Sequence, residues 1–315
     1  MAYDLSVINY RTIRDPVEFI LESDETYEKN VEKAAEKIAE NLKQSPIVLL
    51  AGPSGSGKTT TASKISEALE KHGIKSNYVS MDDYFLGVSE GVTPKTPEGE
   101  FDLESPLCLD IDMINDHFGR LSAGGEVAVP AYDFTAQKRS DRISKTVRLD
   151  KDEVAVFEGI HALNPMFTQK HPEAFKLYIS ARSDVVFRDA VVFKRTWFRL
   201  TRRLVRDYNF RGASPEYTMN MWANVRRGET TYISPYKNTA DFQFDTSLPY
   251  ELAVYNETAT KLFSNIPEGI ERYEELRKVL PALQLFGTID QSMVPENALV
   301  REFIGKKTIN WDDLY

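Results

Sequence analysis

The first part of the chain mixes charged and apolar residues with a helical period. Between residues 24 and 44 the apolar side chains recur at intervals of three and four, which places them on one narrow stripe of a helix. The stripe consists of Val31, Ala34, Ala35, Ile38 and Leu42. Ser23 or Asp24 is the expected N-cap. We expect the stripe to pack on the rest of the protein, with a coiled-coil partner as the alternative and the acidic run as a solvated face.

After this helix, an apolar run and a glycine-rich turn predict a buried strand followed by a helix. Residues 47–51 are all apolar and lie between Pro46 and Gly52, which suits a parallel strand that is buried on both faces. The stretch 58–72 then predicts a helix, and Gly73 suits the left-handed position that ends many helices. This strand–helix pair is the first part of a βαβ unit.

Three further apolar runs extend the predicted sheet. Residues 76–81, 154–157 and 176–180 are each typical of a short strand. Strands that alternate with helices predict an α/β fold with a parallel sheet flanked by helices. The segments 87–100 and 130–141 are rich in turn-forming and polar residues, and we expect both to be mobile loops.

Composition limits the classes of protein that fit. The chain has 315 residues, 42% hydrophobic and 28% charged, so it can bury a large core without disulfides. A net charge of −9 argues against a nucleic-acid partner, and no apolar run approaches the roughly 20 residues of a membrane-spanning helix. The single cysteine, Cys108, predicts a buried thiol. Because the N-terminus has no secretory pattern either, we expect a cytoplasmic protein.

A phosphate-binding motif lies between the first strand and its helix. Residues 52–59 match G-x-x-x-x-G-K-[ST], in which glycines let successive N–H groups point at one anion and the helix dipole adds positive charge. Lys58 can reach the β- and γ-phosphates, and the Thr59 hydroxyl is a ligand for Mg²⁺. We therefore predict that the chain binds ATP and Mg²⁺. The predicted ATP-binding residues are Gly52, Pro53, Ser54, Gly55, Ser56, Gly57, Lys58, Thr59 and Thr60.

Carboxylates stand at the ends of two other predicted strands. Asp82 and Asp83 follow residues 76–81, and Glu158 follows residues 154–157. Ligands of such sheets bind at the carboxyl ends of the strands. We expect Asp82 or Asp83 to accept the proton of an attacking hydroxyl, and Glu158 to hold Mg²⁺. Turn capping is the structural alternative for the aspartates, and a surface position is the alternative for Glu158.

A cluster of basic residues follows the last predicted strand. Arg199, Arg203 and Arg206 share one helical face by their spacing. Because like charges repel, we expect an anion to compensate them, and the phosphates of ATP are the favoured candidate. A nucleic-acid patch and a solvated basic face are the alternatives. The whole cluster comprises Lys194, Arg195, Arg199, Arg202, Arg203, Arg206 and Arg211.

Together these motifs resemble the uridine kinase and phosphoribulokinase family of P-loop kinases. The similarity follows the family's order from about residue 47 to residue 241. Beside the phosphate-binding loop it includes residues 80–85, 101–102, 130–134, 157–160, 202–207 and 211–212. Residues 225–229 and 300–305 also resemble the kinase part of longer bacterial uridine-kinase-like proteins. The resemblance implies a P-loop NTPase-type parallel sheet with flanking helices and a helical lid.

The resemblance also implies which residues are catalytic and which hold the metal ion. Asp82, Lys58 and Arg206 match the family's catalytic residues. Asp82 matches the acid that takes or orients the proton of the acceptor hydroxyl. Thr59 and Glu158, together with Asp82, match the ligands on the metal side.

Substrate contacts are implied in the same way. Asp102 matches the acid that binds the ribose hydroxyls, and Tyr132 matches the aromatic residue that lines the base pocket. Gln137 stands where animal-type uridine-cytidine kinases have a histidine that reads the pyrimidine. Arg203 and Arg211 match lid arginines, whereas Ala213 replaces a further one.

The implied function is transfer of the ATP γ-phosphoryl group to the 5′-hydroxyl of a nucleoside, with uridine and cytidine as the expected substrates. Two alternatives remain open. One is a kinase for another small alcohol, such as a sugar phosphate or another nucleoside. The other is an ATP-binding regulatory or RNA-associated protein that transfers nothing, for which RNA affinity would fall steeply with salt.

The changes of pattern divide the chain into three parts. The expected parts are an N-terminal helical extension (1–45), a P-loop kinase domain (46–246) with a lid at about 195–230, and a C-terminal helical extension (247–315). Helical patterns cover residues 251–263 and 268–280 of the last part. We expect these helices to pack on the kinase domain, with an interface in a homo-oligomer as the alternative.

Overall fold

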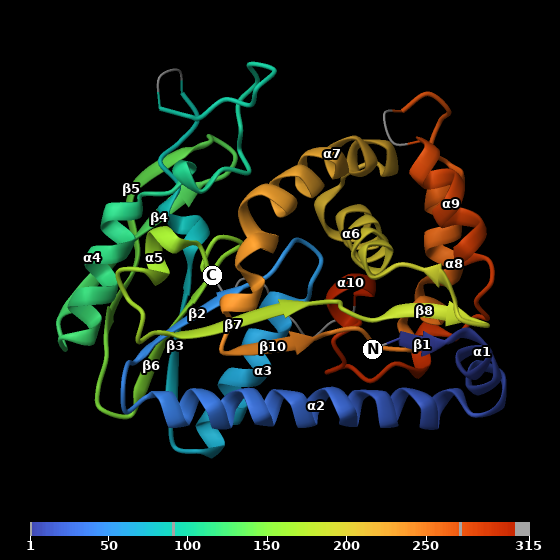
Figure 1. Cartoon of the computed structure of the whole chain (residues 1–315), viewed down its shortest axis with the longest axis horizontal. Helices are drawn as coiled ribbons and strands as arrows, with labels where there is room; N and C mark the ends of the chain where they lie inside the picture. The colour runs from blue at the N-terminus through green and yellow to red at the C-terminus, as the bar shows by residue number, and fades with distance from the viewer. Residues whose placement is uncertain (1, 90–91, 271–272, 306–315) are drawn as a thin grey trace.

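The computed structural model describes residues 2–89, 92–270 and 273–305, and its centre is a five-stranded sheet (Figure 1). The strands are Ile47–Ala51 (β2), Lys75–Ser80 (β3), Glu153–Glu158 (β6), Phe175–Ser180 (β7) and Phe242–Asp245 (β10). Their order is β10-β7-β2-β6-β3, and every neighbouring pair is parallel. The predicted α/β fold is confirmed. The four predicted strands lie within one residue of their expected bounds, whereas β10 was not predicted.

The middle strand β2 alternates its side chains between two hydrophobic cores. Val48 and Leu50 belong to the core on one face, and Ile47 and Leu49 belong to the core on the other. Both faces are covered by helices, which explains why the strand is apolar throughout. The first face is covered by α2 (Pro16–Asn41) and α3 (Lys58–Lys71), and the second by α4 (Ile111–Ser122) and α5 (Pro165–Thr168).

The long N-terminal helix α2 begins earlier than expected. Its N-cap is Asp15 and Pro16 opens its first turn, so Ser23 and Asp24 lie inside the helix and our expected N-cap is wrong. Proline at this position is pre-organised for a helix start. Apolar residues upstream continue the stripe, which is buried against the central domain as expected. The upstream residues that extend the buried face are Phe19, Ile20, Ser23 and Tyr27.

The segment 130–141 forms most of a β-hairpin, so our expectation of a mobile loop is wrong there. Its strands are Glu126–Asp133 (β4) and Lys138–Arg148 (β5). The register shifts on both sides of Pro130, because proline cannot donate to the ladder, and this break disguises the strand in the sequence. At the tip, Asp133 accepts hydrogen bonds from two backbone N–H groups of the turn.

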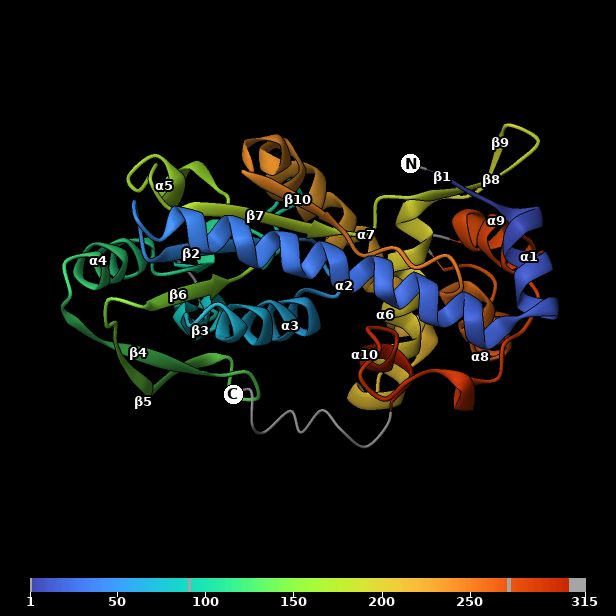
Figure 2. The ribbon, with the colours of Figure 1, turned by 90° about the horizontal axis from the view of Figure 1, so that it is seen from below.

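A second, smaller sheet joins the first residues of the chain to its middle. It consists of β1 (Ala2–Asp4), β8 (Asp184–Phe187) and β9 (Ala190–Phe193), with β1 parallel to β8. Helix α1 (Leu5–Arg14) follows β1. Figure 2 shows α2 running along the molecule from the central sheet towards this small sheet and the C-terminal helices.

The remaining helices pack around α6. They are α6 (Arg195–Arg211), α7 (Pro215–Gly228), α8 (Glu251–Ser264), α9 (Tyr273–Leu283) and α10 (Arg301–Ile304). The helix expected at 251–263 is confirmed, and it packs against α6. The helix expected from residue 268 begins at Tyr273, because Gly269 has a φ of 95° that a helix excludes. Among the described residues, no helix has the length and apolar character to cross a membrane.

Candidate active site

The phosphate-binding loop curls tightly at the carboxyl edge of the central sheet, between β2 and α3. Gly57 has a φ of 80° and Gly55 a φ of 74°, both in the left-handed region. A side chain at Gly52 would place its Cβ 2.1 Å from the carbonyl oxygen of Ile179 on β7. The three glycines are therefore required by backbone conformation and by space, which fits a loop that presents N–H groups to an anion.

Lys58 and Glu158 meet beside this loop. Strands β2 and β6 pair in register, with Leu50 opposite Glu158, so the carboxylate emerges next to the start of α3. The Lys58 Nζ atom lies 3.5 Å from Glu158 Oε1, and the Tyr78 hydroxyl donates to Glu158 Oε2 at 2.7 Å. Both side chains of the ion pair are largely buried. Tyr78, which holds Glu158 in place, belongs to no motif and was not predicted from the sequence.

Asp82 follows β3, the strand next to β6, and lies along the same carboxyl edge of the sheet. It lies in a short 3₁₀ turn, and its side chain keeps access to solvent although protein atoms surround the carboxylate. The surrounding protein desolvates its carboxylate and raises its pKa to about 7; the nearby Glu158 carboxylate raises it further, whereas Lys58 opposes the shift. Asp82 thus belongs to the same electrostatic group as Lys58 and Glu158. Asp83 instead interacts with Lys145 of the hairpin, so the two adjacent aspartates have different surroundings.

The oxygen ligands at this edge fit a magnesium ion. Two carboxylates close enough to raise a pKa leave unneutralised negative charge, which a cation relieves. Thr59 is half-buried at the start of α3, beside Lys58. Mg²⁺ is commonly bound by one or two carboxylates together with phosphate oxygens and water. Within the described residues there is no cluster of three or more acidic, histidine or cysteine side chains that could hold a metal alone.

The second half of α6 carries arginines towards the phosphate-binding loop. Arg203 Nη1 donates to Ser54 Oγ at 2.9 Å. Arg203, Arg206 and Arg211 all lie 3.2–3.3 Å from the carboxylate of Asp207, which is 4% exposed. Three guanidinium groups therefore gather around one carboxylate, on the helix that contacts the phosphate-binding loop.

The first half of α6 differs from our expectation that phosphates compensate the whole basic cluster. Arg199 pairs with Glu229, and Arg195 pairs with Asp184 at 2.6 Å. Arg202 is fully buried and forms a bidentate pair with Glu251, at 2.7 and 2.8 Å. These internal carboxylates come from elements remote in sequence, which local spacing could not reveal.

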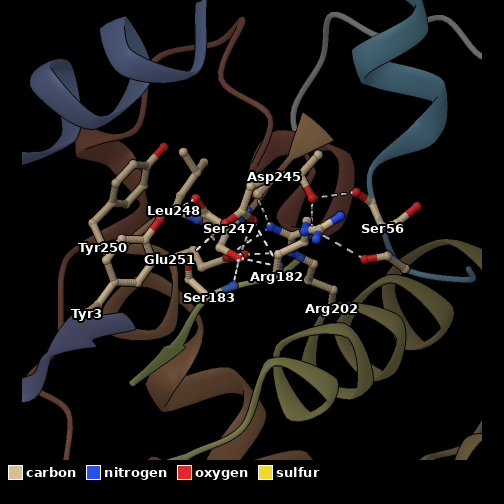
Figure 3. Close-up of polar contacts among 12 residues, drawn as sticks. Tyr3, Ser56, Arg182, Ser183, Arg202, Asp245, Ser247, Leu248, Tyr250 and Glu251 are labelled. Atoms are coloured by element: carbon tan, nitrogen blue, oxygen red, sulfur yellow. Dashed lines mark hydrogen bonds and ion pairs between the residues drawn. The ribbon is translucent and has the colours of Figure 1, made fainter. Parts of the chain in front are cut away.

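Arg202 also connects α6 to the backbone of the loop. Its guanidinium donates to the carbonyl oxygens of Thr246, at 2.6 Å, and Gly55, at 3.4 Å. The Thr246 hydroxyl in turn donates to the carbonyl oxygen of Ser56 at 2.7 Å. Figure 3 shows this arginine between Glu251 and the loop at Ser56. The pair with Glu251 therefore supports the loop from behind and faces no ligand.

Asp102 is buried and already hydrogen-bonded within the chain. Arg227 donates to both of its carboxylate oxygens, at 2.7 and 3.1 Å, and the Tyr232 hydroxyl donates at 2.7 Å. The backbone N–H of Glu104 supplies a fourth contact at 3.2 Å. Burial alone would raise the pKa of Asp102, but these hydrogen bonds together lower it. Arg227 lies in one of the segments that resemble the family, but its pairing with Asp102 was not predicted from the sequence.

An aromatic pocket lies beside the 3₁₀ turn that carries Asp82. It has a volume of about 150 Å³. The rings of Phe85 and Tyr132 are 5.4 Å apart, and those of Tyr132 and Phe134 are 5.0 Å apart. Gln137, at the hairpin tip with a φ of 50°, supplies an amide that can both donate and accept. The lining residues are Phe85, Gly87, Val88, Thr93, Leu103, Cys108, Tyr132, Phe134 and Gln137.

The predicted site residues thus fall into two groups. Lys58, Asp82, Glu158 and the loop form one group at the carboxyl edge of the sheet. Tyr132 and Gln137 line the pocket next to it. Planar aromatic walls with one amide suit a flat ligand that offers hydrogen-bonding edges. The arrangement can hold an anion, a cation and a flat acceptor molecule side by side.

The fold and this edge of the sheet define a P-loop kinase. Within that class, the chain belongs to the Phosphoribulokinase / Uridine kinase family, whose sequence model matches residues 47–251. It is 32% identical over 196 residues to a uridine kinase from Staphylococcus haemolyticus, a match that covers 62% of this chain and 84% of the relative. It is 31% identical over 201 residues to a uridine kinase from Staphylococcus epidermidis, covering 64% and 87%.

Solved structures were compared as well. A D-glycerate 3-kinase from Cryptococcus neoformans covers 84% of this chain and 90% of its own, at 16% identity. Its TM-score of 0.34 is too low to support a conclusion about this chain. The family assignment therefore depends on the sequence match over residues 47–251.

Proposed function

We propose that the protein transfers the γ-phosphoryl group of ATP to the 5′-hydroxyl of a nucleoside, with uridine and cytidine as its substrates. The observation that carries this proposal is the junction of two sites at Asp82. The Asp82 carboxylate interacts electrostatically with Lys58 and Glu158 beside the phosphate-binding loop, and Phe85, three residues further along the chain, lines the aromatic pocket. The family match and the uridine kinase relatives support the same reaction.

In the proposed reaction, Asp82 orients the acceptor hydroxyl and takes its proton. The hydroxyl oxygen forms a bond to the γ-phosphorus while the bond from that phosphorus to the β–γ bridging oxygen breaks, and ADP leaves. Such transition states are loose, so positioning and charge neutralisation supply most of the catalysis. Lys58 and the arginines around Asp207 would neutralise the phosphate oxygens.

We also propose that Thr59, Glu158 and Asp82 hold Mg²⁺ when ATP binds. The ion would neutralise charge on the β- and γ-phosphates. Glu158 is suited to this because Tyr78 fixes one carboxylate oxygen while the other faces Lys58 at 3.5 Å. A cation there would also favour the ionised form of Asp82, which desolvation and the Glu158 carboxylate disfavour.

For the acceptor, we propose that the base lies between the pocket rings and that Gln137 reads its edge. Asp102 remains the proposed ribose contact, but its oxygens are occupied. A ribose hydroxyl would therefore take the position of the Tyr232 hydroxyl, while the Arg227 pair stays in place. We further propose that lid movement is confined to the segment beyond Arg206, since Arg202 fixes the first half of α6 to the core.

A panel of acceptors tests the proposed reaction. The purified protein is incubated with ATP, Mg²⁺ and single nucleosides or sugar phosphates, and both ADP release and the phosphorylated product are measured. We expect uridine and cytidine to give the highest rates. Product from another small alcohol alone would identify the alternative kinase, and slow ADP release that no acceptor changes would indicate an ATP-binding regulator.

Two variants test the assigned roles. Lys58→Ala and Asp82→Asn should each lower turnover by about 10²–10⁴-fold, because each removes a group that acts in the transition state. Circular dichroism and the melting temperature should stay close to those of the wild type. Near-wild-type turnover of Asp82→Asn would end its assignment as the base.

A further inference from the structure

The segment 294–305 lies against the ATP site, although it falls outside the family-matched residues 47–251. Val300 and Phe303 within it are fully buried. Arg301 fixes its path by donating to the carbonyl oxygens of Gln291, at 2.9 Å, and Pro295, at 3.2 Å. Figure 2 shows α10 beside α6. The segment is therefore a built part of the fold.

Two side chains of this segment contact the phosphate-binding loop and the helix after it. The Leu299 side chain occupies the space beside Gly57, where an added Cβ would lie 2.8 Å from Leu299 Cδ1. The Thr60 hydroxyl donates to Glu302 Oε2 at 2.6 Å. Leu299 thus packs against Gly57, and a hydrogen bond joins the first turn of α3 to Glu302.

The same segment contacts the arginine helix. Glu302 Oε1 lies 4.0 Å from Arg206 Nη1. The Asn209 side chain donates to the carbonyl oxygen of Phe303 at 3.1 Å, and the Arg202 guanidinium lies 5.2 Å from the centre of the Phe303 ring. The segment therefore joins α6 to the loop, and none of its residues lines the aromatic pocket.

Glu302 is the point where these contacts converge. One carboxylate oxygen accepts from Thr60 and the other faces Arg206, and the residue is only 3% exposed. A buried carboxylate is costly unless charged and hydrogen-bonding partners compensate it. The two partners here are a residue of the predicted ATP-binding set and a predicted catalytic arginine. Their relative position depends on one side chain.

We propose that Glu302 is a positioning residue for ATP, which rests on the proposed function. It holds the first turn of α3 at a fixed distance from Arg206, so that the loop N–H groups and the guanidinium group can bind the same phosphates. Without the carboxylate, Arg206 is drawn to Asp207, 3.3 Å away on its other side. ATP affinity then falls, while acceptor affinity is unchanged because the aromatic pocket does not contact this segment.

The test compares three variants. Glu302→Gln keeps an oxygen for the Thr60 hydroxyl but loses the charge that faces Arg206, and Glu302→Ala loses both. Glu296→Gln is the matched control, because Glu296 is an exposed carboxylate on the same segment. For each protein we would measure KM for ATP and for the acceptor, the Kd of a non-hydrolysable ATP analogue with Mg²⁺, and amide hydrogen exchange of residues 52–61.

We expect Glu302→Gln to raise the Kd of the ATP analogue and the KM for ATP by about tenfold, the value of one charge-assisted contact. Glu302→Ala should raise them further, and both variants should speed exchange at residues 52–61. The KM for the acceptor should stay within twofold of the wild type. Glu296→Gln should behave like the wild type in every measurement.

Two results would overturn the proposal. If the Glu302 variants lower only the melting temperature, with Kd and exchange unchanged, the residue is structural alone. If they tighten ATP binding, the carboxylate competes with the phosphates. The Kd and exchange measurements need no acceptor, so they decide the role of Glu302 even if the wild-type protein phosphorylates no nucleoside. Should Glu302→Ala fail to fold, Glu302→Gln carries the test.

Discussion

The two halves of α6 use arginine for opposite purposes. In the first half, Arg202 is fully buried and forms an ion pair with the buried Glu251 carboxylate, which no other arginine contacts among the described residues. In the second half, three guanidinium groups surround Asp207, and the Glu302 carboxylate lies 4.0 Å from one of them. The charge of an arginine such as Arg202 is neutralised by its carboxylate, and the pair holds elements of the fold together. Arginines that gather around one shared carboxylate on the helix beside the phosphate-binding loop are placed to meet an anionic ligand.

The largest effect that separates the two halves is expected at Arg202. Replacing it by Met should lower the free energy of unfolding by about 3–5 kcal/mol, because Glu251 is left buried without its partner. Arg195→Met is the control on the same helix, since the Arg195 side chain is half-exposed and its ion pair should be worth less than about 1 kcal/mol. Urea denaturation measures both values. Equal losses in the two variants would contradict the role of Arg202 in holding the fold together.

At Arg206 the contrast should reverse, with activity lost and stability kept. Arg206→Met should lower turnover by about 10²–10³-fold, because one cationic donor to the transferring phosphoryl group is missing. Its free energy of unfolding should fall by less than in Arg202→Met, since Asp207 keeps two other arginines and Glu302 keeps the Thr60 hydroxyl. Turnover and urea denaturation of the same preparation test this. A variant that unfolds easily yet turns over normally would reverse the assignment of the two halves.

The pH dependence of turnover should report the ionisation of Asp82. Arg211, in the second half of α6, acts to lower the pKa of this carboxyl group. Because the base must be ionised, turnover should rise with pH. The pKa of about 7 applies without Mg²⁺, and since the bound ion favours the ionised form, the rise should move to lower pH as Mg²⁺ saturates. The sign for stability is opposite. A folded-state pKa above the unfolded value stabilises the protein below about pH 4, and this contribution is lost as the pH rises through about 7. A pH–rate profile with the same slope in Asp82→Asn would assign the titration to another group.

The smallest effect is expected at Arg227. This arginine pairs with Asp102, the proposed ribose contact, and so belongs to the proposed acceptor site. Arg227→Lys loses the bidentate geometry and should raise KM for the acceptor by about three- to tenfold. KM for ATP should not change, because Arg227 does not contact the phosphate-binding loop. Steady-state kinetics with each substrate varied in turn would measure this split. A rise confined to ATP would place Arg227 with the second half of α6.

Local patterns in the sequence predicted the parts of the fold that are local. Residues 47–51 lie in a strand because they are all apolar, and residues 52–59 form the loop because their glycines permit left-handed conformations. The hairpin at 130–141 escaped prediction because Pro130 interrupts the alternation of the strand. The start of α2 escaped because its upstream stripe is sparse and lies among charged residues.

The partners of buried charges could not be predicted in the same way. Asp102 pairs with Arg227, 125 residues away, and Arg202 pairs with Glu251, 49 residues away. Such pairs leave no periodic trace in one sequence, because only the folded chain brings their elements together. The roles proposed for Asp82, Lys58 and the other site residues remain predictions, which the variants above test.

The position of Cys108 makes the acceptor pocket observable without any engineered label. It is the only cysteine in the chain, it lines the aromatic pocket and it is 8% exposed. Burial raises the pKa of its thiol to about 11, so alkylation should be slow and limited by access. A nucleoside lying against the pocket rings would shield the sulfur. The rate of alkylation by a small maleimide therefore measures what fraction of the pockets is occupied. Such rates can rank unmodified acceptors by affinity before any turnover is measured.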